Sequence, residues 1–539
     1  MTGLNKIFII LMFGLLTVWV SGCIIDEIPT PTEEKTTAEK LQEACDELSI
    51  DLIIEGNITL PTNGKHDSSI SWTSNNENVI STNGNVNVPY YNEKDVDVDL
   101  VATITISSSS IEKTFSVIVK KQEATIETVN YTPGYSFKMN EEDASVFPYY
   151  KGHLYAGLIN KDGTPRLNFN EERGVKTRIN VVKMFGAKAN DPNFDNTQAF
   201  NNASNACGPT GEVYVPEGKY YFSTNAITGP FYAHVVLRNG ASMVGDGPDK
   251  SILVSNYKNG EYVHSSYGKK TTTLYLENSS NSTVSNLGFS ANTDDTCLPK
   301  DPTNTTANNP TGNAKAPAFA IMVYTTSILE ITENVLIEDV YIEYFQYDGI
   351  RLYCTRDCKI NRAYITKSTD VGGGGAGYGI EIRGEGHEAF NRIDSKLDSC
   401  YNIVTNCKIV GPYIRHGIIF SYLSHNNLIA FNEVSETADD AFDVHGQDEF
   451  LNLFTQNYAY RSRRGGFGFG NSGASAMHDE SGYGNVCYKN VIENCYDGIS
   501  VILGTKYTQL IDNIIIGTSR YPINISNGPN TKNENNTII

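Results

Sequence analysis

The stretch GIIFSYLSHNNLIAFNEVSETADDAFDV, residues 417–444, decides the fold of this chain. It opens and closes with a short apolar run that follows a small residue, Gly417 or Ala441, and a second kind of run lies between them. Alternation of apolar and other residues within each run is typical of a strand that buries one face. The first kind of run occurs at 349–352, 379–382, 417–420, 441–444, 466–469 and 498–501, and the second at 337–342, 360–365, 403–409, 428–434, 486–492 and 510–515.

This repeat predicts a solenoid, because a single coil of short strands cannot bury a core and successive coils must stack. Asn residues such as Asn432 recur beside the second run. Asn suits left-handed corners and side-chain ladders between stacked coils. We therefore predict an all-β chain whose C-terminal two-thirds is a parallel β-helix.

The segment that precedes the repeat carries three spaced motifs, VKMFGAKA at 182–189, DNTQAF at 195–200 and GEVYVPEGKY at 211–220. Together they resemble the N-terminal cap of the pectate-lyase superfamily, in which a strand, an amphipathic helix and a turn with Pro and Gly begin the solenoid. The resemblance implies a right-handed parallel β-helix over residues 178–539.

The N-terminus has the features of a targeting segment. Lys6 precedes an apolar run over residues 7–20, which is short for a membrane span, and Ser21-Gly22-Cys23 follows. Small residues followed by Cys resemble a bacterial lipobox, which implies a signal peptide at 1–22, acylation of Cys23 and a lipid anchor on the extracellular face of the cell membrane. An uncleaved anchor or an ordinary secretory peptide is the alternative, and both also place the protein outside the cytoplasm.

Three further segments lead to the solenoid. Residues 23–37 contain Pro and charged residues with nothing to bury, which predicts a tether. Residues 38–122 combine a short helix at 38–48 with alternating strands, which predicts a small antiparallel β-sandwich. This unit resembles the atrophied bacterial immunoglobulin-like domain, which implies a spacer or adhesion module. Residues 123–177 are irregular and are predicted to be a connector.

The composition narrows the class of partner. The formal net charge of −20 argues against nucleic acid, because phosphate binding requires a basic surface. The same charge repels an acidic glycan at long range, so that a site for one requires a local cluster of Arg or Lys. Nine cysteines follow Cys23, none in a zinc-type pair, and buried thiols and disulfides are both open. We expect a monomer.

Stacking the coils on the first kind of run aligns side chains that are far apart in the sequence. Residues between the apolar ones must point outward, and neighbouring coils lie about 4.8 Å apart. Charged side chains then gather on one face as a candidate site with mixed charge, although such ladders also occur as solvated decoration or as turn caps. The predicted members are Glu381, Arg383, Arg415, His416, Asp439, Asp440, Asp443, His445, Arg463 and Arg464.

The first predicted chemistry is β-elimination at a uronic acid, which requires a cation, a base and an acid. Arg415-His416-Gly417 resembles the Arg-His-Gly motif of the chondroitinase B and alginate lyase family. The resemblance implies that Arg415 acts as the acid and that a Lys one coil earlier acts as the base. Lys396 is the matching candidate, although an alignment on Asn402 places Asp398 at that position. His416, Asp440 and His445 complete the predicted catalytic set, and the remaining members of the face are predicted to bind sugars.

Two alternatives stay open. Asp439-Asp440 and His445-Gly446 resemble motifs of polygalacturonases, which implies hydrolysis by two carboxylates. In those enzymes the two motifs lie on neighbouring coils, whereas here they share one coil. A glycan-binding or adhesion lipoprotein without turnover is the other alternative. The oxygen-rich group Asp439, Asp440 and Asp443 is also a candidate set of ligands for Ca²⁺.

Overall fold

The computed structural model describes residues 35–89, 94–121, 126–130, 175–227, 231–257, 270–305, 316–327, 329–372, 376–384, 398–446, 449–470, 482 and 484–539. Within them the chain divides into two compact units, of which the first extends to Lys120, apart from a short linking segment at 89–94. The predicted signal peptide, Cys23, most of the tether, most of the connector and Lys396 lie outside the described residues. None of the helices in the described part is long and apolar enough to cross a membrane.

The first unit packs one helix against one sheet. Helix α1 (Thr37–Glu47) begins with a capping box in which Thr36 and Glu39 satisfy each other's backbone N–H groups. The sheet has the order β1-β4-β3-β2, and its core includes Leu41 of the helix and Trp72 of the sheet. The strands are β1 (Ile53–Ile54), β2 (Ser69–Ser74), β3 (Val96–Ile106) and β4 (Ser109–Val119), with a short 3₁₀ helix η1 (Lys65–Asp67).

The predicted helix is present, and four of the predicted alternating segments form β1 to β4. Two other alternating segments, 58–61 and 79–81, form no strand. In the described residues the hydrogen-bonded strands form one sheet, so α1 supplies much of the second layer that the alternation pattern assigned to strands. The sequence of a short amphipathic segment does not show which other segment it pairs with, because pairing depends on the partner strand.

The second unit begins with a cap. The cap contains β5 (Ile126–Asn130), β6 (Val175–Asn180), α3 (Val181–Phe185), α4 (Thr197–Cys207), β7 (Gly211–Val215) and β8 (Gly218–Phe222). Phe200 of α4 is fully buried and lies edge-on against Tyr220 and Phe222. The helix therefore covers the apolar end of the solenoid, where the first coil has no preceding coil to stack on.

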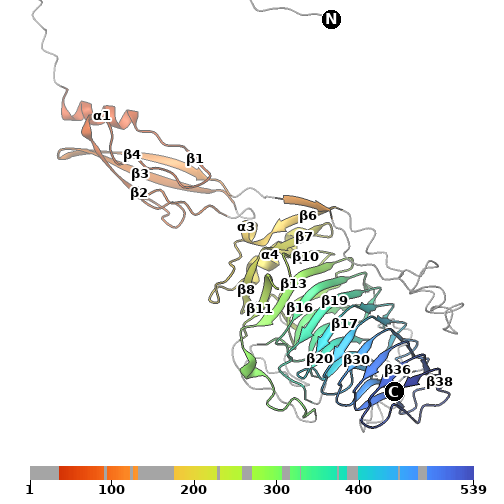
Figure 1. Ribbon diagram of the computed structural model, residues 1–539. Helices are drawn as coiled ribbons and strands as arrows, with labels where there is room; N and C mark the ends of the chain where they lie inside the picture. The colour runs from red at the N-terminus through yellow and green to blue at the C-terminus, as the bar shows by residue number, and fades with distance from the viewer. Residues whose placement is uncertain are drawn as a thin grey trace, which may run out of the picture. The chain divides into compact units, whose positions relative to one another are not determined.

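The rest of the unit is a parallel β-helix whose coils stack from the cap toward the C-terminus (Figure 1). One ten-stranded sheet contains β9 (Phe231–Leu237), β12 (Lys270–Glu277), β14 (Phe319–Tyr324), β17 (Asp348–Tyr353), β20 (Tyr378–Arg383), β24 (His416–Ser421), β28 (Phe442–Val444), β31 (Gly465–Phe469), β34 (Asp497–Ile502) and β37 (Ile523–Ser526). A four-stranded sheet contains β15 (Thr332–Glu333), β18 (Thr355–Arg356), β21 (Ser399–Cys400) and β25 (Ser424–His425).

A third, larger sheet completes each coil. Besides strands of the cap it contains β10 (Ser242–Gly245), β11 (Ser251–Ser255), β13 (Thr283–Ala291), β16 (Leu336–Ile342), β19 (Lys359–Thr366), β22 (Ile403–Thr405), β23 (Lys408–Val410), β26 (Leu428–Ala430), β27 (Glu433–Ser435), β29 (Leu453–Thr455), β30 (Tyr458–Tyr460), β32 (Val486–Tyr488), β33 (Val491–Glu493), β35 (Gln509–Ile511), β36 (Ile514–Ile516), β38 (Lys532–Glu534) and β39 (Thr537–Ile538). A 3₁₀ turn, η4 (Asp295–Cys297), follows β13.

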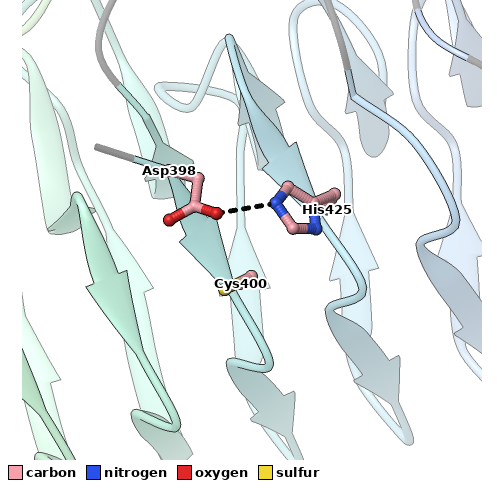
Figure 2. A group of neighbouring side chains, drawn as sticks. All are labelled: Asp398, Cys400 and His425. Atoms are coloured by element: carbon pink, nitrogen blue, oxygen red, sulfur yellow. Dashed lines mark hydrogen bonds and ion pairs between the residues drawn. The ribbon is translucent and has the colours of Figure 1, made fainter. Parts of the chain in front are cut away.

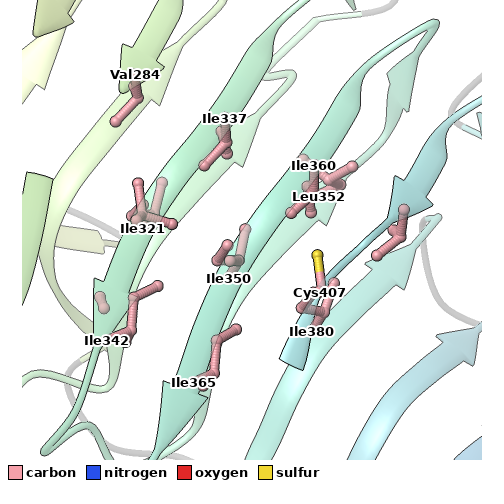
Figure 3. Close-up of a cluster of buried hydrophobic side chains, with 14 of the residues drawn as sticks. Val284, Ile321, Ile337, Ile342, Ile350, Leu352, Ile360, Ile365, Ile380 and Cys407 are labelled. Atoms are coloured by element: carbon pink, nitrogen blue, oxygen red, sulfur yellow. The ribbon is translucent and has the colours of Figure 1, made fainter. Parts of the chain in front are cut away.

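The core consists of apolar columns that run from coil to coil. Ile350 pairs with Ile380, Ile380 with Ile418, and Ile418 with Phe442, and all four side chains are buried. Figure 3 shows Ile350 and Ile380 in this column among the buried side chains of the neighbouring strands. This register confirms the predicted alignment of coils and with it the predicted fold class.

Asparagine ladders hold the corners. Asn432 and Asn457 lie 25 residues apart, and the amide of each donates to the side-chain oxygen of the Asn on the next coil at 3.0 Å. The left-handed backbone that is predicted for corner Asn residues falls, in these ladders, on the preceding residue, which is Phe431 or Gln456. The Asn side chain is then free to point inward. The described cysteines are free thiols, and most are buried.

Candidate active site

The ten-stranded sheet carries the predicted column of outward residues. Arg351 pairs with Glu381, Glu381 with Ile419, and Ile419 with Asp443. Ile419 is buried and separates two groups of charged side chains. The predicted face therefore exists, but it holds two clusters with different degrees of burial.

The first cluster is a buried ion network made of Asp348, Arg351, Glu381 and Arg383. Arg351 Nε lies 2.5 Å from Asp348, and its other side contacts Glu381. The guanidinium lies 4.6 Å from the ring centroids of Phe319 and Tyr347. The opposite charges and the aromatic faces offset part of the cost of burying these charges.

The first cluster does not present Glu381 to solvent. Burial raises the pKa of Glu381, but Arg351 and Arg383 outweigh this effect and leave it below its ordinary value. Burial also raises the pKa of Asp348 well above its ordinary value. Glu381 therefore orients the half-buried Arg383, with 3.3 Å between the charged groups, and this placement does not favour the predicted contact of Glu381 with a sugar.

The second cluster, which we call the acid–base cluster, brings together most of the predicted residues. They lie in the turns before β24, β28 and β31, in β24 and β28, and directly after β28. Neighbouring coils are joined here by backbone hydrogen bonds from Asp439 to Arg415 and from Gly417 to Asp440. The cluster consists of Arg415, His416, Asp439, Asp440, Asp443, His445 and Arg464.

His416 lies beneath the surface of the acid–base cluster. Its Nε2 is 3.5 Å from Asp439, its Nδ1 is 3.4 Å from Asp443, and Tyr378 lies edge-on to the ring at 5.3 Å. Only 1% of the residue is exposed. Burial lowers the pKa of His416 well below its ordinary value. His416 is placed to position the two Asp side chains and lies out of reach of a polysaccharide.

His445 is the more accessible histidine. Its Nδ1 lies 3.3 Å from Asp443 Oδ2, and 16% of its side chain is exposed. Burial raises the pKa of Asp443, yet His416 and His445 outweigh burial and leave this pKa below its ordinary value. An ionised Asp that holds one nitrogen of a half-buried His is the usual arrangement for a general base.

Asp440 has the opposite character. Burial raises the pKa of Asp440 well above its ordinary value, and the nearby Asp439 and Asp443 add to the effect, although Arg464 at 3.8 Å opposes it. The strand of the next coil leaves room for this carboxyl group, because a Cβ at Gly465 would stand 2.5 Å from Asp440 Oδ1. A carboxyl group with a raised pKa is suited to donate a proton.

Two arginines flank these groups. Arg415 lies 3.5 Å from Asp439 and donates to the carbonyl of Gly372 at 3.2 Å, with 14% of its side chain exposed. Arg464 lies 3.2 Å from the other oxygen of Asp439. Both arginines lie beside the carboxylates of the acid–base cluster, where they can attract a carboxylate of a substrate.

A cavity of about 720 Å³ adjoins the acid–base cluster on the C-terminal side. Asp440, Gly468 and Arg464 form one end of it, and the exposed Arg463 belongs to the same lining. The following coils add Arg520 and other polar groups, which sequence reasoning missed because the repeat is weak there. Arg520 pairs with Asp497 at 2.8 Å.

The positions of these side chains do not test the predicted Ca²⁺ site. Ligand atoms of His416, Asp440 and Asp443 lie within 4.8 Å of one another. This set mixes nitrogen with oxygen, whereas Ca²⁺ prefers oxygen alone. Calcium at Asp439, Asp440 and Asp443 therefore stays a prediction.

Comparisons with known proteins concern the two units separately. No curated protein matches the chain by sequence. Among solved structures, an alginate lyase from Paenibacillus sp. is similar over 62% of this chain and 97% of its own, at 13% identity and a TM-score of 0.41. An exopolygalacturonase from Thermotoga maritima is similar over 67% and 91%, at 12% identity and a TM-score of 0.43.

A mannuronan C-5 epimerase module from Azotobacter vinelandii is similar over 67% of this chain and 99% of its own, at 16% identity and a TM-score of 0.34. These structural similarities concern the fold alone and assign no activity. Residues 40–122 match the family model of the atrophied bacterial Ig domain, so the chain joins an N-terminal Ig-like domain to a parallel β-helix.

Proposed function

We propose that the acid–base cluster cleaves a uronate-containing polysaccharide by β-elimination. One observation carries the proposal: His445, 3.3 Å from Asp443, belongs to the same cluster as Asp440, whose pKa is raised, and Arg464, and the last two line the cavity. These are the three kinds of group that β-elimination requires, a base, an acid and a cation.

The base is His445. It takes the proton from C5 of the uronate, and the electron pair left behind forms the C4–C5 double bond. Asp443 at 3.3 Å stabilises the imidazolium that results. This assignment stands on described residues, whereas the base implied by the Arg-His-Gly resemblance, Lys396, lies outside them.

The acid is Asp440, which gives its proton to the glycosidic oxygen as the C4–O bond breaks. Arg464 neutralises the substrate carboxylate, which makes the C5 proton easier to remove, and Arg415 is the second candidate for this role. Arg383 and Arg463 are proposed to bind further sugar units, because both reach solvent on or beside the same sheet.

Hydrolysis is the second candidate, favoured by one observation. Carboxylate oxygens of Asp440 and Asp443 lie within 4.8 Å of each other, and their pKa values are shifted in opposite directions. Such a pair is typical of glycoside hydrolases. The side chain of Asp443 is only 2% exposed and lies between two histidines, which leaves little room for the attacking water.

The setting of the enzyme is part of the proposal. Export, a lipid anchor at Cys23 and a monomeric protein at the extracellular face of the membrane would place the β-helix in contact with external glycans. The Ig-like domain would then act as a spacer or adhesion module, as its family resemblance implies.

The test is incubation of the soluble chain with purified uronate-containing glycans. A lyase produces the ultraviolet absorbance of a C4–C5 unsaturated uronate, and this signal should disappear in His445→Gln but persist in His66→Gln of the Ig-like domain. New reducing ends without that absorbance would establish the hydrolase instead. Retention on a glycan column with neither signal would establish a binding protein.

A further inference from the structure

A group of three side chains lies on the four-stranded sheet, away from the acid–base cluster. Cys400 of β21 and His425 of β25 are directly paired across the two coils, and Asp398 precedes β21 (Figure 2). Their ligand atoms lie within 4.8 Å of one another. Sulfur, imidazole nitrogen and carboxylate oxygen are the three donor types that zinc takes from proteins.

The surroundings hold these donors in place. Asp398 Oδ1 accepts a hydrogen bond from Arg356 at 2.6 Å, which leaves Oδ2 directed toward His425 (Figure 2). The His425 ring stacks on Phe450 at 4.3 Å and is almost parallel to it. A fixed carboxylate and a fixed ring plane are what outer contacts provide in metal sites.

Polar contacts hold both nitrogens of the histidine ring. Nδ1 of His425 lies 2.6 Å from the side-chain oxygen of Asn426, and Nε2 lies 3.0 Å from Asp398 Oδ2. Nε2 and this carboxylate oxygen therefore face the same space, and the ligand atoms of all three side chains lie within 4.8 Å of one another.

Cys400 decides between a metal ligand and a reactive thiol. Cys400 is 2% exposed as a residue, whereas the side chains of His425 and Asp398 are 15% and 22% exposed. The group therefore reaches solvent through the imidazole and the carboxylate, and the buried sulfur is suited to the role of a ligand. Because soft sulfur favours zinc-like ions over calcium or magnesium, the donor set also selects the class of ion.

We propose that Asp398, Cys400 and His425 bind a thiophilic divalent cation of the zinc class. The ion ties together two neighbouring coils of the β-helix. Strand β21 follows β20 and β25 follows β24 in the chain, so these are the same coils that carry Arg383 and His416. The site thus fastens the coils on which the candidate active site is built, without taking part in its chemistry.

The test is titration of the chelator-treated chain with Co²⁺, a spectroscopic substitute for Zn²⁺. We expect about one equivalent bound per chain, with a sulfur-to-cobalt charge-transfer band and with displacement of cobalt by Zn²⁺. Cys400→Ser should lose the band. Cys407→Ser, which replaces a buried thiol in the corner between β22 and β23, should keep it. The band in wild type needs no variant to fold, and its absence from the folded chain would overturn the proposal.

Two further readouts separate this site from the acid–base cluster. Asp440→Asn should bind Co²⁺ with the same band, whereas His425→Gln should lose it. Zn²⁺ should raise the thermal midpoint of the wild type and leave that of His425→Gln unchanged. Cobalt bound without the band, or a band that survives Cys400→Ser, would overturn the assignment to Cys400.

Discussion

At the scale of single residues, burial separates the roles of chemically identical side chains. His416 and His445 both contact Asp443, but His416 is buried and His445 reaches the surface. Asp440 and Asp443 lie on the same coil, in the turn before β28 and in β28 itself, yet their pKa values move in opposite directions. The sequence shows the residue types and their alignment, but burial depends on the segments that pack over them, which no local pattern encodes.

The dyad of His445 and Asp443 makes the first prediction. Replacing Asp443 with Asn removes the charge that stabilises the protonated base, and we expect the rate of glycan cleavage to fall by a factor of about 10² to 10⁴. Initial rates at saturating substrate measure this loss. A rate within a factor of two of the wild type would contradict the role of the dyad. His66→Gln serves as the control.

Substitution of Asp440 is expected to lower the activity and to raise the stability of the chain. Its pKa is raised in the folded chain, so the folded state holds the proton more tightly than the unfolded state, and stability falls as the pH rises above about 4 toward the raised pKa. Asp440→Asn mimics the protonated form and removes this loss. We expect the variant to be inactive but to melt about 2 °C higher at neutral pH.

The pH dependence supplies the check on Asp440. The difference in thermal midpoint between Asp440→Asn and the wild type should grow between about pH 4 and pH 7, and should vanish at the acidic end. The activity of the wild type should fall on the alkaline side as Asp440 loses its proton. A midpoint difference that is constant with pH would show that Asp440 is ionised in the folded chain.

At the scale of strands and coils, register decides which residues meet. The ten-stranded sheet could be aligned from the sequence because its strands follow a small residue and alternate with period two, which places Arg415, Asp439 and Asp440 on neighbouring coils. The strands β21 and β25 are two residues long and have no periodicity, so the meeting of Cys400 with His425 was not predictable.

The glycines of β31 provide a prediction at this scale. A Cβ at Gly468 would stand 3.0 Å from Asp443 Oδ1 and 3.2 Å from Asp440 Oδ2. Gly468→Ala should therefore displace both carboxylates and lower the rate at least tenfold, while circular dichroism stays unchanged. Gly56→Ala is the matched control, because nothing lies within 4 Å of its added carbon. Full activity of Gly468→Ala would separate these carboxylates from catalysis.

The asparagine ladder provides a second prediction at the scale of strands and coils. The buried side chain of Asn457 donates to the carbonyl of Ile429 and to Asn490, and its oxygen accepts from the backbone and side chain of Asn432. Asn457→Ala leaves these groups unpaired, and we expect a loss of about 2–4 kcal/mol in the free energy of unfolding by urea. The exposed Asn533→Ala should cost far less, and equal losses would argue against the ladder.

At the scale of the whole molecule, the two units have separate cores. The core around Trp72 contains only residues of the Ig-like domain, and the core of the β-helix contains only residues from Ile179 onward. The acid–base cluster lies wholly in the β-helix. Expressed from Lys121 onward, the chain should retain the cleavage rate of the full chain on soluble oligosaccharides, as measured by the same product assay. A lost activity in a folded β-helix would show that the Ig-like domain contributes to the site.

The continuous register of the ten-stranded sheet has a consequence for how such a protein changes in evolution. Each coil adds one side chain to every outward column, so duplicating or deleting one coil moves the flanking arginines by one step while the apolar core reseals behind it. Substrate length and charge spacing are then adjustable in units of a coil, without redesign of the cluster that performs the chemistry.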